Sequence, residues 1–139
     1  GREYLEAVLT LATHAEDYAT IERVAARYLP GLNTPAQARS RRWLTERRLQ
    51  NQIESGQGER VLGFTRTERV LPEATLNELR VLALLKLGRA QEAVHELQTW
   101  LERSAADEDV VMRLLARAAR EAGQLEVMDR ALARLVPRS

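Results

Sequence analysis

The chain has 139 residues, a length that suits one ordinary domain or a short stack of repeats. Hydrophobic residues make up 45% of it and charged residues 29%, so it has the apolar surface to fold that a disordered segment lacks. Aromatic residues are only 4%, and Ala, Leu, Arg and Glu dominate, which favours helix over sheet. We therefore expect an all-α protein.

The charge balance and the absence of cysteine exclude several classes of protein. The formal net charge is +1. Proteins that bind the phosphate backbone of nucleic acids usually have an excess of basic residues. We therefore expect no nucleic acid as a partner. Without cysteine there are no disulfides, no thiol catalysis and no thiolate metal sites. No apolar run approaches the roughly 20 residues that a membrane span needs, so no span is expected in this chain.

The two ends of the chain suggest a piece of a longer protein. The sequence begins with Gly1-Arg2 rather than Met. Its last five residues, 135–139, resemble a thrombin site without its glycine, although they could equally be native sequence. Any signal or anchor would then lie outside this piece.

Apolar spacing predicts eight helices joined by short breaks. In chain order they cover 2–14, 17–29, 35–54, 59–71, 75–87, 90–104, 107–122 and 124–136. Thr34 and Thr75 are the expected helix caps, and Pro35 is tolerated in a first helical turn. Gly88 lies between two helices, where a residue without a side chain can take the left-handed conformation that ends a helix. The short breaks predict antiparallel neighbours.

Four helical hairpins in tandem, each of about 34 residues, are typical of a repeat array. We place the repeats at 2–34, 35–73, 74–107 and 108–137, within a single domain 1–139. One such hairpin cannot bury its apolar faces alone, so its neighbours must stack on it and share a continuous core.

The third repeat resembles the tetratricopeptide pattern. In that pattern a glycine or acidic residue makes the turn, and an alanine five residues later lets the two helices approach closely. Gly88 and Ala93 occupy those positions, and Leu97 and Trp100 occupy positions where the pattern has large apolar residues. The resemblance implies a right-handed superhelical solenoid of about four antiparallel helix pairs.

The other repeats fit this pattern with departures. In the fourth, Gly123 fills the turn, but Met128 replaces the alanine. In the second, we assign Gly58 to the turn and Gly63 to the small residue. In the first, the turn is 16–18 and an isoleucine stands in the alanine position. The match is therefore strong over 75–136 and weaker before it.

The sequence contains no recognisable catalytic or metal-binding pattern. The chain has no Gly-rich phosphate loop, no His-Glu-x-x-His and no Gly-x-Ser-x-Gly. His14 and His95 fall in different repeats, and neither has a second histidine at ligand spacing. Carboxylates at 16–17 and 107–109 stand at helix starts, where they stabilise the positive end of the helix dipole. We expect no enzyme activity, no cofactor and no metal.

The resemblance also implies where a partner would bind. In tetratricopeptide arrays the first helix of each pair lines a concave groove that takes a peptide or a partner's helix. Carried over by position, that groove would contain Arg113, Arg117 and Arg120, which share one helical face. The remaining candidate contacts are Arg48, Leu82 and Leu85.

Such a groove would suit an acidic segment of a partner protein. The alternative is a solvated face with internal ion pairs, Asp109 with Arg113 and Arg117 with Glu121, each at i, i+4 spacing. The sequence leaves both interpretations open.

The leading hypothesis is a protein-protein interaction scaffold. Arg-rich, Lys-poor and loosely matching repeats resemble those of long periplasmic scaffolds attached to outer-membrane exopolysaccharide export barrels in bacterial biofilm systems. In that family the repeats recruit a polysaccharide-modifying enzyme to the export pore, so the resemblance favours the periplasm over the cytoplasm and such an enzyme as partner.

Two alternatives remain at the level of sequence. A ligand-sensing or regulatory helical-repeat domain of a bacterial regulator would show a defined pocket or a flanking DNA-binding domain. Nucleic-acid binding by a helical repeat would need a recurring polar residue at fixed base-reading positions, and the groove positions here vary from Glu to Leu to Arg. Because no polar capping helix follows Gly123, head-to-tail self-association could also occur.

Overall fold

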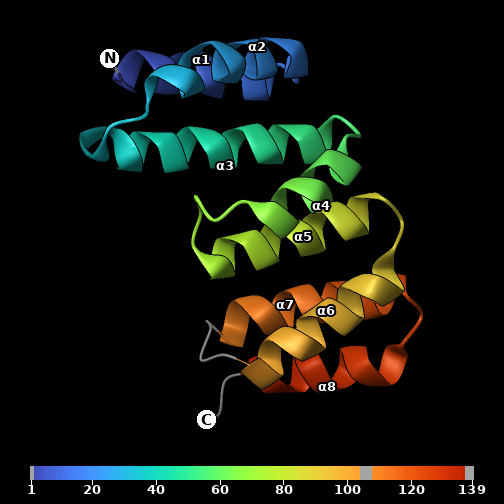
Figure 1. Cartoon of the computed structure of the whole chain (residues 1–139). Helices are drawn as coiled ribbons and strands as arrows, with labels where there is room; N and C mark the ends of the chain where they lie inside the picture. The colour runs from blue at the N-terminus through green and yellow to red at the C-terminus, as the bar shows by residue number, and fades with distance from the viewer. Residues whose placement is uncertain (1, 104–107, 137–139) are drawn as a thin grey trace. The chain divides into compact units, whose positions relative to one another are not determined.

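The structure is a computed structural model that describes residues 2–103 and 108–136 (Figure 1). Over these residues the chain forms eight α-helices and two short 3-10 helices, and it has no strand. The all-α class expected from composition is therefore confirmed.

The chain divides into two compact units, with the boundary between Leu71 and Pro72. The first unit contains α1 (Arg2–His14), α2 (Tyr18–Tyr28), the 3-10 helices η1 (Leu29–Gly31) and η2 (Pro35–Gln37), α3 (Ala38–Glu54) and α4 (Gly58–Thr67). The second contains α5 (Glu73–Lys86), α6 (Ala90–Arg103), α7 (Glu108–Glu121) and α8 (Leu125–Leu135). The boundary lies close to the end of the second predicted repeat, at 73.

Helix bounds follow the prediction except around the start of α5. Helix α4 ends at Thr67 rather than at 71, because Glu68 already takes an extended conformation. Helix α5 begins at Glu73 with Pro72 in the capping position, so the predicted cap at Thr75 is wrong. Pro72 sets this start because its fixed φ is compatible with a helix entrance and its missing N–H costs nothing there. Thr34 does precede η2, and its hydroxyl donates to Gln37 Oε1 at 2.9 Å.

All four hairpins turn in the same way. The second residue after the first helix of each pair has a positive φ, and these residues are Glu16, Gly56, Gly88 and Gly123. In each turn its N–H donates to the carbonyl three residues earlier at 3.1–3.2 Å. The next N–H donates to the carbonyl five residues earlier at 2.7–2.8 Å. These paired bonds define the Schellman motif, which satisfies the last carbonyls of a helix.

The second of these turns corrects the predicted repeat register. Gly56 takes the left-handed conformation, whereas Gly58 lies inside α4 and is buried. The residue five positions after the turn is therefore the fully buried Val61, not Gly63. The error arose because several flexible polar residues and two glycines stand together at 55–58, and composition alone cannot choose between them.

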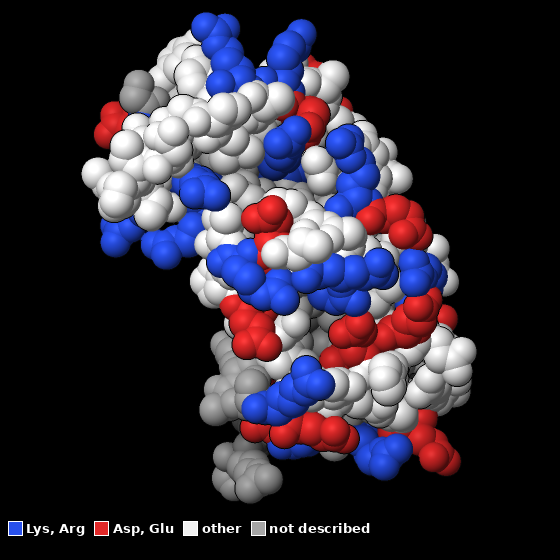
Figure 2. Space-filling model, viewed as in Figure 1, with Lys and Arg blue, Asp and Glu red and all other residues white. Residues whose placement is uncertain are grey.

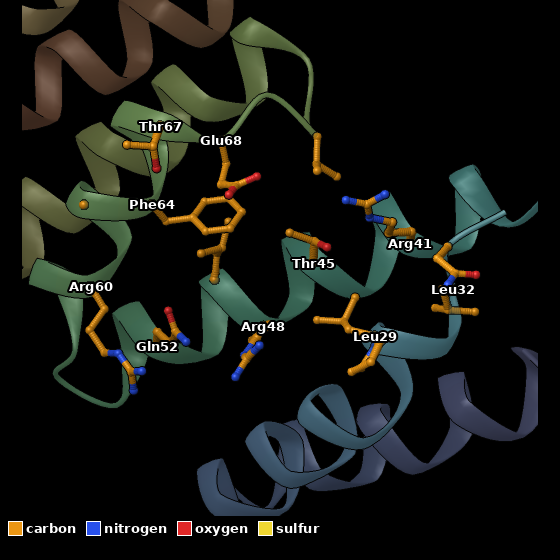
Figure 3. A pocket seen from close by; sticks show the side chains of 15 residues that line it. Leu29, Leu32, Arg41, Thr45, Arg48, Gln52, Arg60, Phe64, Thr67 and Glu68 are labelled. Carbon is orange, nitrogen blue, oxygen red and sulfur yellow. The ribbon is translucent and has the colours of Figure 1, made fainter. Parts of the chain in front are cut away.

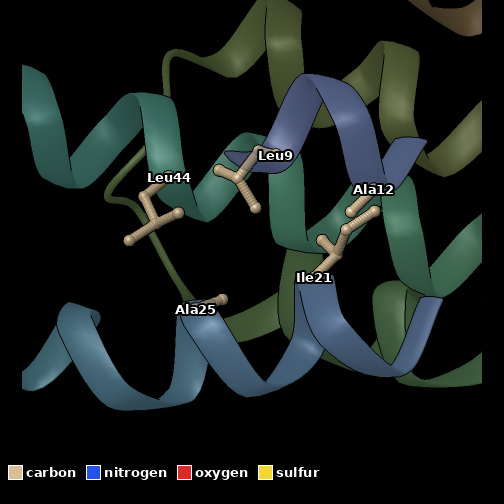
Figure 4. Close-up of a cluster of buried hydrophobic side chains, with 5 residues drawn as sticks. All are labelled: Leu9, Ala12, Ile21, Ala25 and Leu44. Carbon is tan, nitrogen blue, oxygen red and sulfur yellow. The ribbon is translucent and has the colours of Figure 1, made fainter. Parts of the chain in front are cut away.

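The first unit has a small core where α1, α2 and α3 meet (Figure 4). Its buried members are Leu9, Ala12, Ile21, Ala25 and Leu44. Trp43 packs against this cluster and is partly buried. Because α2 contacts both α3 and η1, the chain that leaves α2 stays close to α3.

In the second unit each helix packs against the next one in sequence. Ala93 of α6 is fully buried, as expected for a small residue at a close helix contact, and so is Leu97. Trp100 is 7% exposed. Helix α7 buries one side against α6 and α8, through Val111, Met112, Leu115, Ala118 and Ala119. Its opposite side carries the arginines that the sequence singled out.

Candidate functional site

The three predicted arginines of α7 lie on its exposed side. Arg113, Arg117 and Arg120 all face solvent. Arg117 forms an ion pair with Glu121, at 3.7 Å from Nε to Oε1, as the alternative interpretation expected. Arg113 and Arg120 make no hydrogen bond or ion pair with any residue among 2–103 and 108–136. The face therefore keeps two guanidinium groups that a partner could bind.

The other predicted contacts are less available. Arg48 belongs to the first unit, and its guanidinium donates from Nε and Nη2 to the carboxylate of Glu22, at 2.5–3.2 Å. In the second unit Leu82 is half-buried, and Leu85 is only 7% exposed. Of these three, Leu82 alone offers apolar surface to a partner.

The first unit contains an open cavity of about 660 Å³ that no sequence pattern had located (Figure 3). We call it the α3 groove, because one face of α3 forms its floor. That face comprises Arg41, Thr45, Arg48, Leu49 and Gln52. Their spacing of three and four residues places them on one side of a helix.

Two further segments form the sides of the α3 groove. The chain around η1 lines one side through Leu29, Pro30, Leu32 and Asn33. Helix α4 and the residues after it line the other through Arg60, Gly63, Phe64, Thr67, Glu68 and Val70. Figure 3 shows the Phe64 ring extending from α4 into the space above α3. The groove thus combines an apolar lining with polar groups at fixed positions.

Thr45 and Gln52 are the unexpected polar groups of the floor. They are 7% and 6% exposed, although the helix that contains them is rich in polar residues. Neither side chain hydrogen-bonds to any residue that the structure describes. Asn51 Oδ1 is the one buried side-chain oxygen or nitrogen without a partner among the described residues, so the polar atoms of Thr45 and Gln52 are open to the groove and can bond to water or to a ligand there.

The groove carries a positive charge. It contains three arginines and one carboxylate, and Arg48 is already neutralised by Glu22. Arg60 donates from Nη1 to the neutral Gln57 Oε1 at 3.1 Å and keeps its charge. The Arg41 guanidinium projects into the same space as Phe64 and has no partner within the described part of the chain (Figure 3). The groove therefore favours an anionic ligand.

A smaller cavity, of about 250 Å³, lies between α1 and α3. Its lining includes Arg2, Tyr4, Tyr28 and Trp43. The Arg2 guanidinium carbon lies 5.3 Å from the centre of the Trp43 ring, and Arg2 Nε is 3.0 Å from Glu6 Oε1. The cation of this cavity is thus already bound by the protein's own side chains.

Other kinds of site find no support in the described residues. Among 2–103 and 108–136, no three His, Asp or Glu side chains gather closely enough to hold a metal ion. Within the same residues, no helix is both long and apolar enough to cross a membrane. On the face displayed in Figure 2, basic and acidic side chains are interspersed.

Comparisons with protein-family models, with curated proteins and with solved structures find no match for this chain. The chain's own residues provide two candidate surfaces, the arginine face of α7 and the α3 groove.

Proposed function

We propose that the chain is a protein-protein interaction scaffold of the tetratricopeptide kind, a right-handed superhelical solenoid of helix pairs that positions a partner protein. The observation that carries the proposal is the repeated turn. The same Schellman motif closes the hairpins at Glu16, Gly56, Gly88 and Gly123. A recurring hairpin with a recurring turn is the unit from which helical-repeat arrays are built.

The exposed arginine face of α7 supports a binding role. Arg113 and Arg120 carry charges that no described residue neutralises, and Arg117 is 51% exposed beside Glu121. Guanidinium groups bind carboxylates in a forked geometry, so an acidic segment of a partner fits this face. In the periplasmic setting that the sequence resemblance implies, the partner would be a polysaccharide-modifying enzyme.

One observation favours the alternative of a ligand-sensing or regulatory domain. The α3 groove has a volume of about 660 Å³, and small-molecule sites commonly range from about 300 to 1,000 Å³. The groove is open, however, and its polar groups are spread along α3 rather than converging on one point. That layout suits an elongated ligand better than a compact metabolite.

The scaffold function is tested by affinity capture of partners from a lysate of the source organism, read by mass spectrometry. The bait carrying Arg113→Glu, Arg117→Glu and Arg120→Glu is compared with the unmodified chain. A captured protein is then purified, and its Kd for each bait is measured by calorimetry. We expect a partner that binds the unmodified chain and that binds the triple variant at least about tenfold more weakly.

A matched control separates the site from the net charge. Arg39→Glu, Arg42→Glu and Arg66→Glu alter three exposed arginines outside both candidate surfaces. Both triple variants move the formal net charge from +1 to −5. If the α7 variant and the control variant lose the same amount of binding affinity, the loss is due to the change in net charge and not to the arginine face of α7. Failure of the unmodified chain to hold any protein would contradict the scaffold function.

A further inference from the structure

The α3 groove has a glycine where helix stability would favour another residue. Gly63 lies in the middle of α4 and lines the groove. Glycine in a helix interior is destabilising relative to alanine. Packing does not require it here, because a Cβ added to Gly63 would meet no atom within 4 Å. The missing side chain leaves the α4 backbone open to a molecule in the groove.

The floor of the groove offers hydrogen bonds along a line. Thr45 and Gln52 are seven residues apart on α3, a separation of about 10 Å along the helix axis. An extended peptide covers that distance in about three residues. Its backbone N–H and C=O groups are free to bond, whereas those of a helical ligand are satisfied internally. The two unpaired groups therefore favour an extended chain.

The charge and the apolar lining define the chemistry of that chain. Arg41 supplies a guanidinium without a partner among the described residues, and it lies four residues before Thr45 on the same face of α3. Phe64 is half-buried and lines the cavity with apolar surface. A ligand that satisfies these groups together carries a carboxylate for Arg41 and an apolar side chain for Phe64.

We propose that the α3 groove binds an extended acidic segment of a partner protein, in which an apolar residue stands close to an Asp or Glu. The inference rests on the proposed scaffold function and adds the chemistry of the bound segment. It also adds the α3 groove as a second binding surface, in addition to the arginine face of α7 that was proposed above for an acidic segment.

The experiment selects ligands without assuming their sequence. A library of random dodecapeptides displayed on phage is panned against the whole chain, and enriched peptides are synthesised with a fluorescein label. Their Kd values are measured by fluorescence polarisation. We expect enrichment of Asp and Glu over Lys and Arg, together with one apolar residue at a constant distance from the carboxylate.

Charge reversal then tests whether the selected peptides occupy the groove. Arg41→Glu should weaken binding by at least about tenfold, because it replaces the attraction with repulsion. Arg39→Glu is the matched control: it makes the same change on the same helix, at an exposed residue outside the groove. The control should bind within about twofold of the unmodified chain.

Two further variants separate binding from folding. Gly63→Leu places a branched side chain in open space at the side of the groove and raises the helix propensity of α4, so binding should weaken and the Tm should not fall. Gln52→Leu removes an amide that is unpaired in the free protein. It should therefore weaken binding by several-fold without lowering the Tm.

The outcomes distinguish this inference from the scaffold function. Failure to enrich any peptide, enrichment without acidic residues, or unchanged binding to Arg41→Glu and Gly63→Leu would each overturn it. Peptides that keep their affinity for the groove variants and lose it with the triple α7 variant would also overturn it. In that last case the scaffold function would stand.

Discussion

Asp17 illustrates how a single exposed carboxylate fixes a helix start. It stands one residue before α2 and accepts hydrogen bonds from the backbone N–H of Thr20 at 3.2 Å and from its hydroxyl at 2.6 Å. The hydroxyl bond is the larger cause that lowers the pKa of Asp17 below its ordinary value of 3.8. The sequence already predicted that the carboxylates at 16–17 support a helix start, and for Asp17 this is confirmed.

The lowered pKa predicts how this cap depends on pH. The folded chain binds the Asp17 proton less tightly than the unfolded chain does, so Asp17 stabilises the fold fully above its unfolded pKa. That contribution is lost as the pH falls through the folded value. The difference in Tm between the unmodified chain and Asp17→Ala, measured by circular dichroism, should therefore be present at about pH 6 and vanish toward about pH 2.

The Asp17→Asn variant is the control for that prediction. Asparagine caps helices nearly as well as aspartate but does not titrate, so the advantage of Asp17→Asn over Asp17→Ala should not change across the same range. A Tm difference between the unmodified chain and Asp17→Ala that stays constant down to the acid limit would contradict the assigned role of the carboxylate.

The pair Arg48 and Glu22 joins α3 to α2, since the guanidinium of Arg48 holds both carboxylate oxygens of Glu22. Each side chain is about 30% exposed, so solvent screens the pair only in part. We expect a coupling free energy of about 1 kcal/mol in a double-mutant cycle with Glu22→Gln and Arg48→Met, measured by urea unfolding. Additive single effects would show that the pair contributes nothing to stability.

At the scale of the element, the four hairpin turns differ in one respect. Three have glycine at the left-handed position, and the first has Glu16 with φ 53°. A residue with a Cβ is destabilised by roughly 1 kcal/mol in this conformation. Glu16→Gly should therefore stabilise the chain by up to about 1 kcal/mol in urea unfolding, with α1 still ending at His14.

A substitution of the opposite kind, glycine to a residue with a Cβ at another of the four turns, provides the comparison. Gly88→Ala adds a Cβ at φ 76° and should destabilise the chain by about 1 kcal/mol. Its side chain would meet no atom within 4 Å, so the cost would come from the backbone conformation alone. Destabilisation by Glu16→Gly would mean that a Glu16 side-chain interaction outweighs the strain of its turn.

The sequence predicted the helices well because their signals are local. Apolar periodicity, Gly88 and Gly123 define α5 to α8 within about two residues over the described range. The groove could not be predicted in this way. Thr45 and Gln52 line a cavity that residues 29–33 and 60–70 also line, and Leu85, expected at a binding surface, is buried. No pattern within one helix reports which of its faces another segment covers.

At the scale of the whole molecule, two terminal helices expose apolar side chains. Leu125 and Leu132 of α8 are 58% and 45% exposed, and they lie on one face because they are seven residues apart. Tyr4 and Leu11 of α1 have the same spacing and are 67% and 72% exposed. Exposed apolar side chains on one face of a helix are typical of an interface when they form a contiguous patch.

These faces give the predicted head-to-tail self-association a concrete test. In sedimentation velocity the unmodified chain should show a weight-average mass that rises with concentration. Leu125→Glu with Leu132→Glu should lower that mass toward a monomer, because charges then occupy the apolar face. Arg130→Glu on the same helix serves as an exposed control. A monomer at every concentration would exclude self-association through α8.

The two tryptophans give each compact unit its own optical reporter. Trp43 packs at the edge of the first core beneath the Arg2 guanidinium, and Trp100 is 7% exposed in the second unit. Replacing either one with Phe leaves a single tryptophan, whose emission under selective excitation follows one unit alone. Coincident unfolding midpoints in the two single-tryptophan chains would show that the two compact units unfold cooperatively. Separate midpoints would show that one unit can unfold while the other stays folded.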